Sequence, residues 1–325
     1  MKPVAFAVTA TMLGLCVTLS LSKGPPAIAL AESTPSPALL VATSTFLMYV
    51  EGDRRQPAVA GPSAGAYRAV GSAADGSAYV SFDDGAFTNV ETISPALTTR
   101  TVKTFPRGTA IFRADDGFLA FDASSQLVRR YDGRGSLVGA PVVGLGMAEA
   151  LGVGDTIVTL GGGRLRVFER NGRERKEINL EGNALTPLPG ARFALNDVRD
   201  GEVRAYTTAL EQTATLKYVG LPVRALASSP DGALAVLAGT PACVTSNAEI
   251  DVFTDLHAQP AARIHGGVTS TNALAISADA VYAVNAPCRS DEDGSINVYA
   301  RDGTARGTLR SVGIPISIQP FRRAS

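Results

Sequence analysis

Apolar and polar residues alternate in short runs along most of the chain, and each run ends near an aromatic residue. A period of two residues puts successive side chains on opposite faces of a strand, so these runs predict β-strands, and helical periodicity is nearly absent. The runs are TFLMYVEG from residue 45, QLVRRYDG from 126, RLRVFERNG from 164, EVRAYTT from 202, EIDVFTD from 249 and SINVYARDG from 295. FTNVETI from 87 fits the series with Glu91 in the aromatic place.

The aromatic positions recur at a regular interval of 37 to 47 residues. With Glu91 included, they fall at Tyr49, Glu91, Tyr131, Phe168, Tyr206, Phe253 and Tyr299. A second strand precedes each run and opens after a turn, and Asp-Gly at 75–76, 116–117 and 231–232 suits a tight hairpin. About four strands in a repeat of roughly 42 residues is typical of a β-propeller blade.

The two ends of the chain together complete one repeat. LLVAT and TFLMYVEG match the second and third strands of a unit, and VGIPISIQP from 312 matches a first strand such as VGLPVRALA from 219. We therefore predict an all-β, seven-bladed β-propeller over residues 38–325, with N-terminal strands and the C-terminal strand closing one composite blade. Because the run at 87 is weak, six and eight blades are the alternatives.

The sequences VGLP…ALASSPDGALAVLAG…EIDVF and SINVYARDGTARGTLRSVGIPISI resemble the YVTN/YncE-like seven-bladed propellers of bacterial exported proteins. The resemblance covers nearly the whole chain after residue 38. The motif that names the family is degraded to AVNA at 283–286 and ALND at 194–197. These motifs belong to blade construction, so the resemblance implies a fold and does not imply a ligand.

The first 31 residues have the layout of a secretory signal peptide. Lys2 precedes an uncharged apolar run over 4–21, and Ala29-Leu30-Ala31 forms an A-x-A cleavage site. We expect a signal peptide at 1–31, a short linker at 32–37, and an exported protein, periplasmic or extracellular, with no stable membrane insertion after cleavage. The alternative is a retained membrane anchor, because the run approaches the ~20 residues that a spanning helix needs.

Charge and composition exclude several classes of function. The chain has 30 basic and 30 acidic residues and no dense Lys/Arg run, which argues against nucleic acid as a partner. It has no tryptophan, which excludes WD-dipeptide, Asp-box and Trp-docked quinoprotein propellers as close relatives. Only Cys243 and Cys288 remain after the predicted cleavage, in loops of consecutive blades. Export favours a disulfide between them, and two free thiols are the alternative.

The stretch PCRSDEDG at 287–294 carries Asp291, Glu292 and Asp293 in a row. Calcium loops usually alternate their ligands, whereas adjacent acidic side chains diverge. We therefore expect a solvated hairpin tip and no metal or other cofactor, with calcium at Asp291 and Asp293 as the weaker alternative.

Polar residues are expected at the start of each inner strand, around the central channel. Counting back eight positions from each hairpin turn gives Arg68, Thr109, Met147, Asn183, Arg224 and Asn272, with Glu149 two residues after Met147. Two arginines and two asparagines at equivalent places could bind a carboxylate or phosphate. The alternative is a water-filled rim without a specific ligand.

Two classes of function remain open. His257 and His265 lie away from the predicted rim, and neither a G-x-S-x-G elbow nor a Ser/His/Asp set is present. We therefore favour a non-enzymatic scaffold that binds a protein, peptide or small molecule on its looped face near the channel. The alternative is a lactonase-like hydrolase or lyase that uses the polar rim.

Overall fold

The computed structural model describes residues 38–43, 46–51, 54–57, 68–73, 75–218, 220–240, 248–265, 273–285, 294–310, 312 and 315–321. The compact unit that contains them is Pro37–Ser325. Across these ranges every regular element is a β-strand, and no helix is long and apolar enough to cross a membrane. The predicted signal peptide and linker, residues 1–37, lie outside the described ranges and stay predictions.

Five separate sheets each contain four strands in an antiparallel meander. Four of them follow chain order: β4 (Arg68–Ser72), β5 (Ala78–Asp83), β6 (Phe87–Ile93) and β7 (Thr99–Pro106); β16 (Gly182–Leu188), β17 (Arg192–Asp197), β18 (Glu202–Thr207) and β19 (Gln212–Lys217); β20 (Val223–Ser228), β21 (Leu234–Ala238), β22 (Glu249–Phe253) and β23 (Ala262–His265); β24 (Leu274–Ile276), β25 (Ala280–Asn285), β26 (Ser295–Ala300) and β27 (Ala305–Leu309).

The fifth four-stranded sheet joins the two ends of the described chain. It contains β28 (Pro315–Pro320), β1 (Ala38–Thr43), β2 (Leu47–Glu51) and β3 (Arg54–Pro57). Strand β1 pairs on one side with β2, through Leu40 and Tyr49, and on the other with β28, through Leu40 and Gln319. The ring of Phe321 then meets Tyr49 edge-on, with centroids 6.0 Å apart. The predicted composite blade is therefore present.

The remaining eight strands form one continuous sheet. Within the described ranges the structure therefore has five four-stranded sheets and one eight-stranded sheet, and not the seven separate four-stranded blades that were predicted. The sheet runs through β11 (Val142–Val143), β10 (Leu127–Asp132), β9 (Gly117–Asp122), β8 (Ala110–Ala114), β12 (Met147–Val153), β13 (Thr156–Gly161), β14 (Arg164–Phe168) and β15 (Glu174–Asn179). Its two halves meet where Gly152 of β12 pairs in parallel with Ala114 of β8. A Cβ on Gly152 would lie 2.5 Å from the Ala114 Cβ, so only glycine allows this approach.

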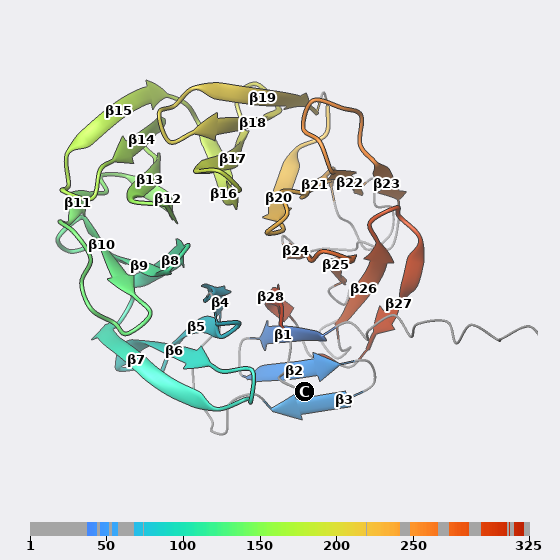
Figure 1. Cartoon of the computed structure of the whole chain (residues 1–325), viewed down its shortest axis with the longest axis horizontal. Coiled ribbons are helices and arrows are strands. Elements are labelled where there is room, and N and C mark those ends of the chain that lie inside the picture. Colours follow the sequence, from blue (N-terminus) through green and yellow to red (C-terminus); the bar gives the residue numbers. More distant parts are fainter. Residues whose placement is uncertain are drawn as a thin grey trace, which may run out of the picture. The chain divides into compact units, whose positions relative to one another are not determined.

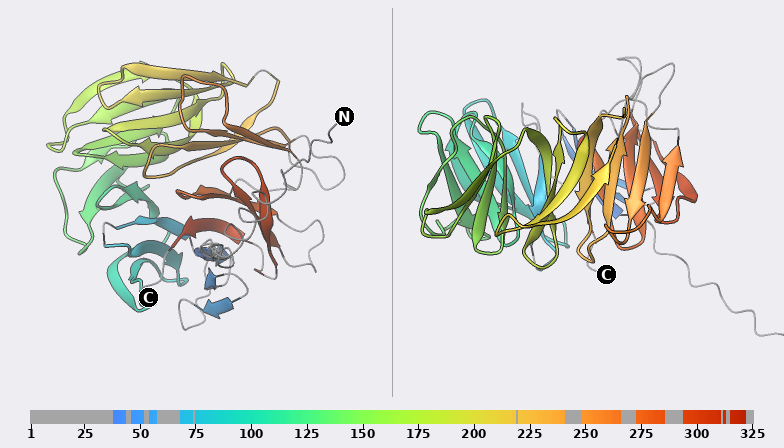
Figure 2. Two further views of the ribbon diagram at one scale, coloured as in Figure 1. Left: turned by 45° about the vertical axis from the view of Figure 1, so that its right-hand side comes forward. Right: turned by 90° about the horizontal axis from the view of Figure 1, so that it is seen from above.

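The sheets surround a centre in a ring, and Figure 1 shows the first strand of each repeat innermost. These inner strands are β4, β8, β12, β16, β20, β24 and β28, and each contacts the next around the circle. This arrangement is a β-propeller, as predicted. The strands run between the two flat faces of the ring (Figure 2, right).

The rim face is the one at which the inner strands begin, at residues such as Arg68, Met147 and Asn183. Because successive strands are antiparallel, it also carries the links between second and third strands and between sheets. The turn face is the opposite one, with the hairpins at 75–76, 116–117 and 231–232.

The core lies between neighbouring sheets and not within any one of them. Val158 and Leu165 of one sheet pack with Phe193 and Tyr206 of the next. The recurring aromatic residues belong to this interior, since Tyr49, Tyr131, Phe168, Tyr206 and Phe253 are all buried and Tyr299 is partly buried. The periodic aromatic position is therefore a position that packs one sheet against its neighbour.

Candidate functional site

The predicted rim residues lie at the starts of inner strands on the rim face. Arg68 begins β4, Glu149 is the third residue of β12, Asn183 and Arg224 are second in β16 and β20, and Thr109 immediately precedes β8. Asn272 lies outside the described residues. The five described positions therefore stand at or next to the starts of inner strands, and their contacts differ from one another.

β-Bulges occur near the start of several inner strands. The pairing shifts between Ala69 and Gly71, between Met147 and Glu149, between Asn183 and Thr186, and between Val223 and Ala225. A bulge leaves backbone groups unpaired and turns nearby side chains to a new direction. The sequence contained no turn signal at these places, so the bulges were not predicted.

Glu149 caps one of these bulges. Its carboxylate accepts the backbone N–H of Ala184 at 2.8 Å and of Leu185 at 2.6 Å. These two residues of β16 are skipped by the ladder with β17, and Ala184 has a φ of 58°. Glu149 thus satisfies two backbone donors that the sheet leaves unpaired and joins β12 to β16. The Glu149 side chain therefore stabilises the scaffold at this predicted rim position.

Asn183 also belongs to a structural chain of hydrogen bonds. Its Oδ1 accepts from the Nδ2 of Asn196 at 2.9 Å, and the same nitrogen lies 3.4 Å from the carbonyl oxygen of Val223 in the next sheet. Asn196 itself is buried. Thr109 donates its hydroxyl to the carbonyl of Pro106 at 2.8 Å, within its own turn.

Arg68 and Arg224 remain as exposed cations of the predicted rim. Arg224 directs Nε toward the Gly239 carbonyl at 3.3 Å, and neither arginine forms an ion pair within the described part of the chain. The rim therefore offers two guanidinium groups to a ligand, while Glu149, Asn183 and Thr109 bind to the protein itself.

No group of three or more His, Cys, Asp or Glu side chains suited to a metal is found among the described residues. The predicted disulfide partners Cys243 and Cys288, and the calcium alternative at Asp291 and Asp293, lie outside those residues and stay predictions. His257 stands in the turn between β22 and β23, and His265 Nδ1 is 3.6 Å from a Glu249 carboxylate oxygen. His257 therefore lies on the turn face, and His265 ends the outer strand β23, whereas the predicted rim residues belong to the inner strands.

Most of the exposed large apolar side chains in the described ranges stand on the rim face. Seven large hydrophobic residues are exposed in the described ranges, and all except Leu137 stand at links or strand ends of this face: Phe46, Phe87, Val143, Leu145, Val198 and Ile316. Leu137 follows the turn after β10 and is bridged to Tyr131, near the turn face. Alternation alone did not predict these residues, because they lie in links or at strand ends.

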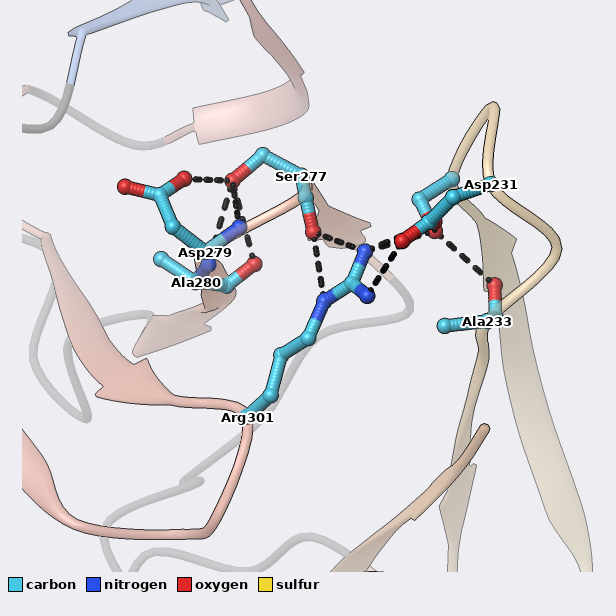
Figure 3. A network of polar contacts seen from close by, with 7 residues as sticks. Asp231, Ala233, Ser277, Asp279, Ala280 and Arg301 are labelled. Atoms are coloured by element: carbon cyan, nitrogen blue, oxygen red, sulfur yellow. Dashed lines mark hydrogen bonds and ion pairs between the residues drawn. The ribbon is translucent and has the colours of Figure 1, made fainter. Parts of the chain in front are cut away.

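The turn face carries polar contacts between sheets. Arg301, between β26 and β27, donates Nε to the carbonyl of Ser277 at 2.8 Å and reaches the carboxylate of Asp231 in the neighbouring sheet (Figure 3). The pKa of Asp231 is lowered, first because its carboxylate accepts hydrogen bonds from Arg301. Arg130 similarly contacts Asp116 at 2.6 Å and the carbonyl of Gly154 across the junction of β8 and β12.

No protein-family model matches the chain, and no curated protein matches it, so membership of the YVTN/YncE-like family is not shown. Solved structures do match. A functionally unknown protein from Desulfotomaculum acetoxidans DSM 771 has a TM-score of 0.64 and 10% identity, over 89% of this chain and 100% of that one. A protein from Lactobacillus plantarum has a TM-score of 0.62 and 14% identity, over 87% and 99%.

The periplasmic gluconolactonase PpgL of Pseudomonas aeruginosa is similar as well, with a TM-score of 0.62 and 15% identity over 89% of this chain and 99% of that one. At such identities the likeness concerns the fold alone. The chain is thus a β-propeller whose rim face combines two exposed arginines with scattered exposed apolar side chains.

Proposed function

We propose that this chain is an exported, non-enzymatic binding protein that docks a partner protein on its rim face. The observation that carries the proposal is the distribution of exposed apolar side chains, of which Leu145 at 58%, Val198 at 51% and Phe87 at 50% are the most exposed on this face. Exposed apolar groups on one face, among polar links, are typical of protein interaction sites. Arg68 and Arg224 add the residue type that interfaces favour.

The lactonase-like alternative loses support from the contacts of the rim. A general base needs a carboxylate that can reach a substrate proton, but both oxygens of Glu149 are occupied by backbone N–H groups. Asn183 is likewise joined to Asn196. The similarity to the P. aeruginosa gluconolactonase extends to fold only, so it does not bring that activity to this chain.

Export is proposed from the layout of residues 1–31. We also propose that the eight-stranded sheet acts as two blades, which gives seven in all. In support, each half is a four-strand antiparallel meander, and a single parallel residue pair, Gly152 with Ala114, joins them. An experimental structure in which β8 and β12 share a continuous hydrogen-bonded ladder would contradict this count.

The binding proposal is tested by crosslinking in the cell envelope of the source organism, followed by identification of the captured protein. Phe87→Ser and Leu145→Ser together should abolish capture, whereas Leu137→Ser should not. Leu137 is a matched control because it is 53% exposed and lies near the other face. Capture that survives the double change would refute a rim-face interface. Lactone hydrolysis by the purified chain, lost in Asn183→Ala, would support the enzymatic alternative instead.

A further inference from the structure

A cleft lies on the outer wall of the ring, between the sheet that ends in β19 and the next sheet. It has a volume of about 460 Å³, within the range of small-molecule sites. Its walls come from the end of β19, from β22 and β23, and from the turn at 254–261 that joins them. None of the predicted rim residues lines it, so binding here does not depend on the proposed function of the rim face.

A buried carboxylate organises this cleft. Asp251, at 2% exposed, accepts Arg263 Nε at 2.7 Å and Nη2 at 3.1 Å, and Tyr218 from the neighbouring sheet donates its hydroxyl at 3.2 Å. Asp251 and Arg263 are also directly opposite in the ladder between β22 and β23. Burial, followed by the negative charge of Asp251, raises the pKa of Tyr218, which keeps its hydroxyl protonated as a donor. The guanidinium is therefore held in one orientation by bonds on a single edge.

The second edge of that guanidinium carries unused donors. Nη1 has no hydrogen-bond partner in the described part of the chain, and the Arg263 side chain is 49% exposed. The edge formed by Nη1 and Nη2 presents two parallel N–H groups, the geometry that matches a carboxylate bidentately. A fixed arginine loses little conformational entropy when it binds such a group.

Other donors line the same cleft. Lys217 has its Nζ 4.0 Å from Glu202 as its nearest ion pair, with a side chain that is 72% exposed, and the side chains of His257 and Gln259 have no partner among the described residues. Glu249 lies 3.9 Å from Arg263 Nε and Glu202 lies 4.0 Å from Lys217 Nζ, so the attraction for an anion comes from the exposed ends of Arg263 and Lys217 and not from a net positive lining. Leu256 and Pro260, which are partly exposed, supply apolar surface beside these groups, and Phe253 is buried behind them.

We propose that this cleft binds a small organic carboxylate, whose carboxylate group pairs with the open edge of Arg263 and whose short apolar body lies against Leu256 and Pro260. Lys217 strengthens binding through its charge. Asp251 and Tyr218 are positioning residues, since they hold Arg263 and do not touch the ligand.

The test uses hexanoate as the probe and the purified chain without residues 1–31, followed by ligand-observed NMR titration. Hexanamide, which has the same body without the charge, serves as the control ligand, and inorganic phosphate serves as a second anion. Hexanoate should bind, while hexanamide and phosphate should bind at least about tenfold more weakly. Hexanamide lacks the negative charge, and phosphate lacks the planar pair of oxygens that matches the Nη1 and Nη2 edge of Arg263. Absence of hexanoate binding, or equal binding of phosphate or hexanamide, overturns the proposal.

Three variants locate the binding. Arg263→Gln should weaken hexanoate at least about tenfold and Lys217→Gln about threefold, as expected for a direct and a nearby charge. Arg164→Gln is the matched control, because Arg164 is also 49% exposed and paired with a carboxylate, that of Glu177, in another sheet; it should bind as the parent does. If Arg263→Gln fails to fold, Lys217→Gln decides, and unchanged binding in that variant refutes the site.

Discussion

Arg301 forms a bidentate ion pair with Asp231 across the boundary between two sheets. Its Nη1 lies 2.6 Å from Oδ2 and its Nη2 lies 2.9 Å from Oδ1. The same guanidinium donates to the Ser277 carbonyl in its own sheet. One side chain therefore fastens the hairpin turn at 231–232 to the turns of the following sheet, as Figure 3 shows. Such contacts matter in a ring, because each sheet is held mainly by its two neighbours.

Replacing Arg301 by methionine should lower the free energy of unfolding by about 1–3 kcal/mol, since charged hydrogen bonds are lost and a carbonyl loses its donor. Arg170→Met is the control, because the pair between Arg170 and Asp155 is exposed on both sides and should contribute less than about 1 kcal/mol. Urea denaturation measures both values. Equal effects of the two changes would mean that the Arg301 bridge adds nothing.

The same bridge predicts a response to acid. The pKa of Asp231 is lower in the folded chain than in the unfolded chain. The ionised Asp231 therefore stabilises the fold fully above about pH 4, the ordinary carboxyl range, and this stabilisation is lost as the pH falls through the lowered pKa. Asp231→Asn should remove that part of the acid dependence. The comparison is the melting temperature of parent and variant from pH 6 down to pH 2, and parallel curves would contradict the linkage.

Glu149→Ala should destabilise the chain by about 2–4 kcal/mol, because two backbone N–H groups in the bulge of β16 lose their acceptor. Glu149→Gln keeps one acceptor oxygen and should cost less. A catalytic role would instead predict near-normal stability for both variants. Denaturation midpoints of the two variants, with exposed Glu174→Gln as the control, distinguish these outcomes.

The junction of the eight-stranded sheet depends on the missing side chain of Gly152. An alanine there would bring its Cβ to 2.5 Å from the Ala114 Cβ and 3.0 Å from its Cα, so Gly152→Ala should cost about 1–3 kcal/mol through overpacking. Gly71→Ala is the control, since its nearest neighbour is the flexible stem of Arg113 at 3.2 Å. A stable Gly152→Ala variant would show that β8 and β12 can separate freely.

Ring closure gives a further expected outcome. Removal of residues 315–325 deletes β28 and uncovers Leu39 and Val41 of β1, which pack in the cluster that includes Ile318. We expect loss of cooperative unfolding and binding of a hydrophobic dye, because the opened ring exposes an edge and a core face. Deletion of the residues after Phe321 alone should leave unfolding cooperative. A cooperative transition in the longer deletion would contradict closure by β28.

The sequence was sufficient to predict the local features of the strands and the closure of the ring by the C-terminal strand. Three signals predicted the strand order and the composite sheet: the aromatic spacing, the Asp-Gly turns, and the likeness of VGIPISIQP to VGLPVRALA. Each of these signals depends only on residues that are neighbours in the chain. The contacts of Glu149 with Ala184 and of Gly152 with Ala114 join residues 35 and 38 positions apart across sheets. These contacts depend on how closely two sheets approach each other, and the periodicity of the sequence gives no information on that distance. The sequence therefore predicted neither the structural role of Glu149 nor the joining of β8 to β12.

Glu91 occupies the place where the other repeats have a packed aromatic residue, and burial raises its pKa. Its Oε2 is buried without a partner among the described residues, while Oε1 accepts a hydrogen bond from Thr101 at 3.3 Å. A carboxyl whose pKa is raised by folding is charged at a cost at neutral pH, and this cost disappears as the pH falls through the raised value.

Glu91→Gln should therefore stabilise the chain at pH 7 by about 1 kcal/mol, because it removes a poorly solvated charge and keeps the shape. The gain over the parent should shrink as the pH is lowered toward 4, where the parent becomes protonated. Thermal unfolding of both chains between pH 4 and pH 8 provides the comparison, and exposed Glu174→Gln should show no such trend. A variant that is less stable than the parent at pH 7 would mean that the Glu91 carboxylate forms a favourable contact. Burial of the charged Glu91 would then not lower the free energy of unfolding.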